Sequence, residues 1–217
     1  MVMAYDAGRQ VTVMFGGIGG DIYDYDALAD TWEWDGTNWH AVPTLTAPEP
    51  RFSQAMAYDA ARGVTVLFGG YVDEGWTNDT WEYDGTDWAK RETGTAPDYG
   101  YSPAMVYDSL RHETVLVTGW PMETWVWDGV DWTPRVPVTS PEVWPGTWNM
   151  VFDENRGVAV LLANYTSVGT SSYHKQTWEW NGTDWRHVDT ANAPTVRSNF
   201  GMAYDVARRK SVIFGGW

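Results

Sequence analysis

One segment recurs five times along this chain, and that recurrence constrains the fold more than any other feature of the sequence. In its clearest copy, residues 56–70, an apolar run is followed by a short polar stretch and a second apolar run that ends in two glycines. Related copies lie at residues 3–17, 105–119, 150–163 and 202–216. Self-similarity at this length is typical of repeat architectures, in which each unit packs on its neighbours. We therefore expect the 217 residues to form a single domain.

Each copy of this first segment predicts two short strands joined by a turn. The run Val64-Thr-Val-Leu-Phe68 is β-branched and aromatic, as strands prefer. Gly63, just before it, can adopt the positive φ that a tight turn needs. Gly69 and Gly70 then end the strand, where the absence of side chains lets the backbone bend or be approached closely.

A second segment sits between successive copies of the first and predicts a β-hairpin. In Thr80-Trp-Glu-Tyr-Asp84, aromatic and acidic residues alternate with the period of two that is typical of a strand. Asp84-Gly85 is a tight-turn dipeptide, and Trp88 begins the return strand. The four copies of this hairpin lie at residues 30–39, 79–88, 123–132 and 176–185. Because no stretch has helical periodicity, the sequence predicts an all-β protein built from units of four strands.

The residues at the ends of these strands resemble the kelch repeat family, most closely the bacterial kelch proteins that are grouped with the central domain of galactose oxidase. The resemblance covers essentially the whole chain and is carried by Phe-Gly-Gly at 15–17, 68–70 and 214–216 and by the aromatic pairs Trp34/Trp39, Tyr83/Trp88, Trp127/Trp132 and Trp180/Trp185. It implies a kelch-type β-propeller of four-stranded blades, with the first strand of each blade innermost and the Trp-bearing strand outermost. The third copy has Thr118-Gly119 at the double-glycine corner and the fourth has no glycine, so we expect different loops there.

The first segment has five copies and its complement only four, so we predict four full repeats plus an extra half-blade. The repeats span about residues 1–50, 51–99, 100–144 and 145–196, and the half-repeat spans 197–217. Three interpretations are open: a fragment of a larger propeller, a closed four-bladed ring with one half-blade displaced, or several chains joined through the spare half-blade. A bare half-blade exposes strand edges that proteins usually cover, which favours a homo-oligomer formed through the half-blade termini.

The balance of charged residues limits the class of partner. With 29 acidic against 14 basic residues the formal net charge is −15, which argues against nucleic acid and anionic membrane surfaces. The chain has no cysteine, so disulfides, thiolate metal sites and a cysteine nucleophile are absent. No apolar run approaches the roughly 20 residues that span a bilayer, and no signal peptide opens the chain. We expect a soluble protein, in a compartment that the sequence does not define.

Residues that could carry metal or catalytic chemistry are few. Asp21, Asp24 and Asp26 offer hard oxygen ligands for calcium, but their spacing fits no EF-hand loop, and an acidic solvated loop is the better interpretation. The four histidines are scattered and form no ligand pattern. Galactose oxidase-type copper chemistry depends on a tyrosine cross-linked to cysteine, so it is not supported here. We find no nucleophile elbow or phosphate loop either, and therefore expect no cofactor and assign no catalytic residue.

Aromatic residues outside the repeated positions are better candidates for ligand binding. The resemblance implies that the loops before the first strand and after the second strand of each blade converge on one face around a central channel. Aromatic rings beside a few polar groups suit sugars, peptides or partner proteins. The ligand-binding candidates on this loop face are Arg51, Phe52, Trp76, Tyr99, Tyr101, Trp120, Trp144 and Arg197.

Three functional hypotheses follow from these patterns. The first is a non-catalytic binding or interaction module, with a protein, peptide or carbohydrate ligand on the loop face. The second is a propeller hydrolase or lyase that uses carboxylates at the channel mouth; it rests on fold analogy alone. The third is a structural unit that forms oligomers through its spare half-blade. Clustered carboxylates around the channel would favour the second over the first, and the mass in solution tests the third.

Overall fold

The computed structural model describes residues 2–20, 25–98, 100, 103–142, 147–166 and 173–216, and every regular element in them is a β-strand. Blade 1 comprises β1 (Val2–Asp6), β2 (Val11–Gly20), β3 (Tyr25–Trp34) and β4 (Trp39–Val42). Blade 2 comprises β5 (Ala55–Asp59), β6 (Val64–Val72), β7 (Gly75–Tyr83) and β8 (Trp88–Arg91). Blade 3 comprises β9 (Ala104–Asp108), β10 (Glu113–Thr118), β11 (Glu123–Trp127) and β12 (Trp132–Arg135). Blade 4 comprises β13 (Thr147–Asp153), β14 (Val158–Thr166), β15 (Tyr173–Trp180) and β16 (Trp185–Val188). A two-stranded sheet, the half-blade, follows with β17 (Phe200–Asp205) and β18 (Lys210–Gly215).

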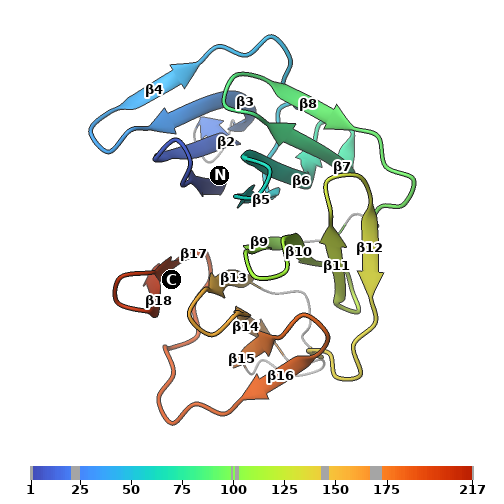
Figure 1. Cartoon of the computed structure of the whole chain (residues 1–217), viewed down its shortest axis with the longest axis vertical. Helices are drawn as coiled ribbons and strands as arrows, with labels where there is room; N and C mark the ends of the chain where they lie inside the picture. The colour runs from blue at the N-terminus through green and yellow to red at the C-terminus, as the bar shows by residue number, and fades with distance from the viewer. Residues whose placement is uncertain are drawn as a thin grey trace.

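The blades are antiparallel sheets arranged around a common axis as a four-bladed propeller. Within each blade the strands are hydrogen-bonded in chain order, from β1 to β4 and likewise in the others. The first strands β1, β5, β9, β13 and β17 contact one another in succession, so they are innermost. Figure 1 shows the blades following one another around the axis, with the ring open between the half-blade and blade 1. The predicted all-β fold of four blades and an additional half-blade is confirmed.

The hairpin predicted at Asp84-Gly85 forms because the aspartate side chain organises its own turn. One carboxylate oxygen of Asp84 accepts hydrogen bonds from the backbone N–H groups of Thr86 and Asp87, at 2.8 and 3.0 Å. The turn places Tyr83 opposite Trp88 on the neighbouring strand, with ring centroids 5.1 Å apart. The side chains of Asp35, Asp128 and Asn181 accept the same backbone bonds in the other three blades.

Successive blades are joined by an aromatic residue of one blade that packs on the blade before it. Trp88 of blade 2 meets Phe15 of blade 1 edge-on, with ring centroids 5.1 Å apart, and both are almost fully buried. The Trp88 indole N–H also donates to the Thr31 hydroxyl of blade 1 at 2.9 Å. Trp132 donates to Thr80 and Trp185 donates to Thr124 in the same way, both at 2.8 Å. Burial and one repeated hydrogen bond therefore define each junction.

A second polar contact is present at two junctions and absent from the third. The Tyr83 hydroxyl donates to Glu33 of blade 1 at 3.0 Å, and the Trp127 indole donates to Glu82 of blade 2 at 2.9 Å. At the third junction the equivalent donor is Trp180, and the equivalent position of blade 3 holds Val126. The indole N–H of Trp180 is consequently buried with no hydrogen-bond partner. Such an orphaned donor costs stability.

The corners after the second strands differ between blades, as the glycine pattern predicted. In blades 1 and 2 the pairing register shifts between Phe15 and Gly17 and between Phe68 and Gly70, which marks a β-bulge. Gly16 has a φ of 57°, and a Cβ there would lie 2.7 Å from the Arg51 carbonyl oxygen. Blades 3 and 4, which lack the double glycine, pair their second and third strands without that shift.

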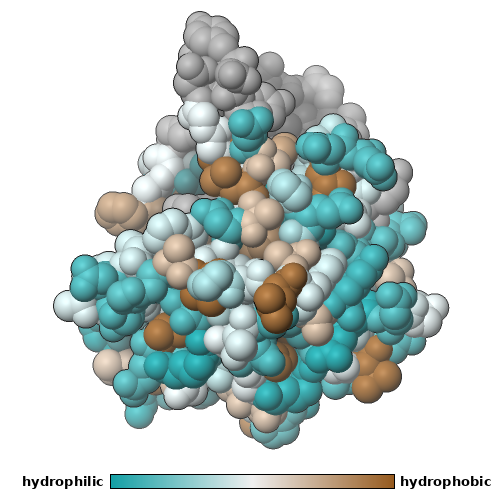
Figure 2. Space-filling model, turned by 90° about the horizontal axis from the view of Figure 1, so that it is seen from above, coloured by the Kyte–Doolittle hydropathy of each residue, from teal (hydrophilic) through white to brown (hydrophobic). Residues whose placement is uncertain are grey.

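The outer surface seen in Figure 2 is mainly hydrophilic, with hydrophobic residues in small scattered groups. This is consistent with the acidic composition of the chain, since charged side chains cover the strands away from the junctions. Within the described ranges there is no helix long and apolar enough to cross a membrane.

Candidate functional site

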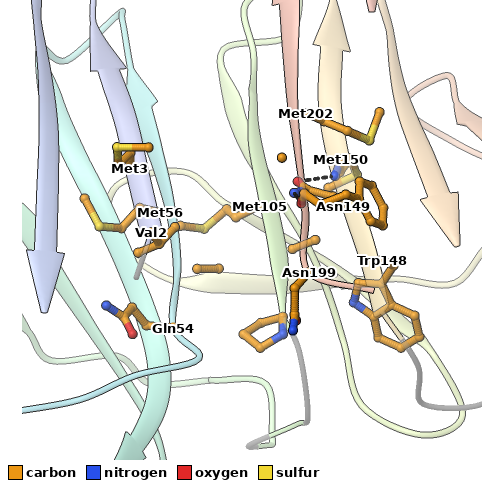
Figure 3. Close-up of a pocket in the computed structure, with 15 residues that line it drawn as sticks. Val2, Met3, Gln54, Met56, Met105, Trp148, Asn149, Met150, Asn199 and Met202 are labelled. Carbon is orange, nitrogen blue, oxygen red and sulfur yellow. Dashed lines mark hydrogen bonds between the residues drawn. The ribbon is translucent and has the colours of Figure 1, made fainter. Parts of the chain in front are cut away.

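Residues from all five sheets border a cavity of about 590 Å³ on the propeller axis. It is lined by the innermost strands and by the residues that lead into them (Figure 3). One methionine from each sheet borders it, at positions 3, 56, 105, 150 and 202. Met56 and Met105 are buried in the clusters that join blade 1 to blade 2 and blade 2 to blade 3. Their side chains thus pack between neighbouring blades. The polar groups that border the cavity belong to other residues.

Gln54, Asn199 and Trp148 supply the polar and aromatic groups at one end of this cavity. Figure 3 shows Gln54 on one side and Asn199 with Trp148 on the other. Asn149 lies deeper and is already engaged, because its amide donates to the Phe200 carbonyl at 3.1 Å and its oxygen accepts a backbone N–H. The cavity mouth therefore combines amide groups with an aromatic ring.

Gln54 is the least satisfied of these groups. Its side-chain nitrogen donates to the Phe15 carbonyl at 2.8 Å across the junction between blades 1 and 2. Its side-chain oxygen is buried without a hydrogen-bond partner, and the residue is only 5% exposed. Ser53, which precedes it with a φ of 58°, turns the chain so that Gln54 points inward. The amide is held in place by its own nitrogen, and its oxygen keeps an unused acceptor position.

A second hollow of about 460 Å³ shares Gln54 and Asn199 with the axial cavity and extends toward the corner of blade 1. Its wall combines the apolar side chains of Ile18, Leu28 and Phe52 with the polar side chains of Asp30 and Ser53. Together these two hollows form what we call the axial site.

Two of the predicted ligand-binding aromatics belong to one cluster beside this hollow. Phe52 lines it directly and packs on Tyr71, with ring centroids 5.2 Å apart. Tyr71 in turn meets Trp76 edge-on at 5.4 Å. Trp76 therefore lies behind Tyr71, in a separate shallow hollow of blade 2 with Glu49 and Lys90. The aromatic residues of blade 2 support one wall of the axial site, and Phe52 is the one that reaches it.

Arg51, predicted on charge alone, is only 1% exposed and its guanidinium is fully engaged. It binds both carboxylate oxygens of Asp79, at 2.6 and 3.0 Å, and donates to the carbonyls of Gly69 and Glu49 at 3.0 Å. Burial alone would raise the pKa of Asp79, but hydrogen bonds from Arg51, Trp81 and Thr77 and the charge of Arg51 outweigh it and lower that pKa. Arg51 thus fixes the loop that presents Phe52 and Gln54.

Arg197 occupies the equivalent position in the half-blade. It donates to the Gly215 carbonyl at 2.9 Å and to the Thr195 carbonyl at 3.2 Å, as Arg51 does to Gly69 and Glu49. Its second terminal nitrogen donates to the Thr195 hydroxyl at 3.1 Å. Within the described residues the half-blade has no third strand to supply a carboxylate like that of Asp79.

Of the remaining predicted residues, the structure describes Trp120 and places it away from the axial site. Trp120 is half-exposed beside a separate apolar groove of about 820 Å³ on blade 3, which also includes Pro134 and Val136. Tyr99, Tyr101 and Trp144, and the calcium candidates Asp21 and Asp24, lie outside the described residues; Asp26 is exposed on β3. Across the described ranges, no group of three or more His, Asp or Glu side chains is placed to hold a metal ion. Ligand contact by the predicted residues stays a prediction.

Sequence reasoning missed the amide residues of the axial site. Gln54 and Asn199 stand just before an innermost strand, at positions where the other repeats hold different residues. That departure from the repeat is the signal that could have found them, because a position varied among otherwise similar units is not needed for packing. The side-chain oxygen left without a partner has no signature in the sequence.

The strand topology defines the fold class of this chain. It is a four-bladed β-propeller of four-stranded antiparallel sheets, with an additional two-stranded sheet. No protein-family model matches it, and no curated protein is detectably similar to it.

Proposed function

We propose that this chain is a non-catalytic binding module that takes a neutral, polar ligand at the axial site. The observation that carries the proposal is the side chain of Gln54, which lines both hollows of the site and whose buried oxygen has no hydrogen-bond partner. A ligand that donates an O–H or N–H to this oxygen relieves the cost of burying it unpaired.

The groups around Gln54 define the chemistry of the ligand. Phe52 offers a partly exposed aromatic ring, Trp148 is a buried part of the cavity wall, and Asn199 adds an amide that can donate and accept. Aromatic rings next to amides match the alternating apolar and hydroxyl faces of a carbohydrate, or the backbone and side chains of a peptide loop on a partner protein. The net charge of −15 opposes an anionic ligand.

The hydrolase or lyase hypothesis has less support. Acid–base catalysis at the channel mouth needs carboxylates close together. Among the described residues, the axial cavity is lined by amide, thioether, aromatic and aliphatic groups, and the second hollow adds a single carboxylate, that of Asp30, rather than a pair.

We further assign the blades to the kelch type. The Phe-Gly-Gly corners of blades 1 and 2 and the paired aromatics of the outer hairpins support this assignment. It is a proposal about ancestry, and the binding proposal does not depend on it.

The binding proposal is tested by probing the full chain with an array of defined oligosaccharides and with a displayed library of random peptides. We expect binding in one of the two formats, weakened at least tenfold by Phe52→Ala and by Gln54→Met. Trp120→Ala, on the distant groove of blade 3, should leave it unchanged. Binding lost only in Trp120→Ala would move the site to blade 3. Absence of binding in both formats would contradict the proposal.

A further inference from the structure

The two ends of the open ring expose surfaces that are buried at every internal junction. On the half-blade, Phe214 is 85% exposed, whereas Phe15, at the equivalent position of β2, is completely buried under Trp88 of blade 2. On blade 1, Trp39 is 43% exposed, although it is the counterpart of the buried Trp88. One end therefore displays the apolar residue that a tryptophan covers, and the other end displays such a tryptophan.

The polar groups of the two ends match in the same way. Inside the molecule, a tryptophan that begins a fourth strand donates to a threonine of the preceding blade, as Trp88 does to Thr31. Thr177 of blade 4 is the next threonine in this series; it is partly exposed, because the half-blade brings no fourth strand. Within the described residues Trp39 makes no corresponding bond. Trp39 and Thr177 are thus a donor and an acceptor that would meet if blade 1 of one chain packed on blade 4 of another.

The glutamate contacts extend this match. Glu82 of blade 2 accepts a hydrogen bond from the aromatic residue that ends the third strand of blade 3. Glu179 is its counterpart in blade 4 and is bound by Arg156 and Arg186 of its own blade, as Glu82 is by Arg62 and Arg91. Trp34 holds the equivalent donor position in blade 1. It does not meet Glu179 here, because blade 1 and blade 4 are not packed on each other in the single chain.

A charged pair links the same two elements. Arg197 makes the same two carbonyl contacts as Arg51, and among the described residues no carboxylate pairs with it. Asp30 begins the outer part of β3 as Asp79 does in β7, and each accepts an indole N–H from the tryptophan two residues later. Asp30 is exposed, and among the described residues no arginine pairs with it as Arg51 pairs with Asp79. Asp30 of β3 and Arg197 of the half-blade therefore complete each other.

These observations point to one occupant of both ends. We propose that two copies of this chain exchange half-blades, so that residues 195–216 of one copy pair with β3 of the second copy in the place that β1–β2 occupies here. The half-blade repeats β1–β2 at Met-Ala-Tyr-Asp and Phe-Gly-Gly, and its strands pair in the same register. It also brings Arg197, the partner that Asp30 lacks within one described chain.

The exchange satisfies the groups exposed at both ends, and it releases β1–β2 of each copy from β3 and β5, whose contacts the incoming half-blade takes over. Pairing of β18 with β3 places Arg197 beside Asp30 of the second copy. The hairpin β3–β4 then covers blade 4 of the first copy, with Trp39 on Thr177 and Trp34 on Glu179. Phe214 passes under Trp88 of the second copy, as Phe15 does here. Three whole blades from each copy and two composite blades close an eight-bladed ring with two-fold symmetry, which lies within the usual range of propellers.

Charge reversal tests the exchange in the full chain. Light scattering during size-exclusion chromatography should give the wild type twice the 24.5 kDa mass of one chain. Arg197→Asp and Asp30→Arg should each be single chains, because each sets like charges together at both contacts. Circular dichroism should match the wild type, since neither residue forms an ion pair within one described chain. Arg209→Asp, which makes the same charge change in the exposed turn of the half-blade, should keep the doubled mass.

Mixing the two variants gives the decisive result. Only an assembly of one Arg197→Asp chain with one Asp30→Arg chain restores opposite charges at a contact, so the doubled mass should return in the mixture. A wild-type protein that stays a single chain at every concentration, as closure of one chain on itself would require, overturns the proposal. A doubled mass that both variants retain, or that mixing fails to restore, overturns it equally.

Discussion

Replacing Val126 with glutamate should stabilise this protein, although it places a carboxylate in a buried position. Val126 is 3% exposed and stands where blades 1 and 2 hold Glu33 and Glu82. The Trp180 indole N–H that faces this junction is buried without an acceptor. In blade 2 the equivalent glutamate accepts from an indole and is paired with Arg62 at 2.5 Å. Blade 3 has Arg111 in the place of Arg62, so Val126→Glu meets both a donor and a cation.

The magnitude follows from the hydrogen bonds that form and from the desolvation of the carboxylate. An orphaned buried N–H costs about 1–3 kcal/mol, and a hydrogen bond to a charged group contributes about 1.5–3 kcal/mol. Desolvating a carboxylate costs several kcal/mol, which the paired arginine largely offsets. We expect Val126→Glu to raise the free energy of unfolding by about 1 kcal/mol, a shift of about 2–4 °C in Tm for a chain of this size.

Urea unfolding of the full chain, followed by tryptophan fluorescence, measures this change. The matched control is Val115→Glu, because Val115 is also buried and is paired with Val126 across neighbouring strands. It has no glutamate counterpart in blades 1 or 2 and should lose several kcal/mol. The indole proton signal of Trp180 should also move downfield in Val126→Glu. A loss of more than about 1 kcal/mol in Val126→Glu would refute the equivalence of the junctions.

Three further outcomes are expected. Arg51→Ala leaves the Asp79 carboxylate without its buried partner and should lower the free energy of unfolding by about 3–5 kcal/mol, measured by urea titration. Since the pKa of Asp79 is lowered in the folded state, this pair stabilises the fold above the unfolded pKa of about 3.9 and the contribution is lost as pH falls through the lower folded value. Acid titration followed by circular dichroism should show that Arg51→Ala loses less stability over this window. Trp88→Ala should cost about 3–5 kcal/mol in the same titration. Trp39→Ala, equivalent in the repeat but exposed at the open end of a single chain, should cost under about 1 kcal/mol when it is added to the single-chain variant Arg197→Asp.

The sequence predicted the parts of the fold that depend on neighbouring residues. The hairpin at Asp84-Gly85 and the bulge at Gly69-Gly70 follow from the turn chemistry of those few residues. The blade count followed from counting repeats. The orphaned Trp180 was not predictable in this way, because Trp127 is satisfied in the same sequence context and the difference lies on another blade.

The residues of the candidate site were harder to predict, because their contacts also depend on residues far away in the sequence. Aromatic Phe52 was selected because it departs from the repeat, and it lines the axial site. Arg51 was selected for its charge, but its carboxylate partner lies 28 residues away, a pairing that only the fold reveals. Gln54 was passed over because a glutamine carries no chemical signature. Its importance arises from a hydrogen bond that fixes one end of the amide and leaves the other unpaired.

At each junction the aromatic donor of one blade needs a glutamate on the blade before it. This requirement limits how such a chain can lengthen by gene duplication. A tandem copy of blade 2 would place Tyr83 against the Glu82 of its twin, so the new junction would be satisfied at once. A tandem copy of blade 3 would place Trp127 against Val126 and create another indole without an acceptor. Blades 1 and 4 hold the same combination of glutamate and aromatic donor as blade 2, so any of these three can be duplicated with a satisfied junction. Lengthening through blade 3 requires the valine to change first.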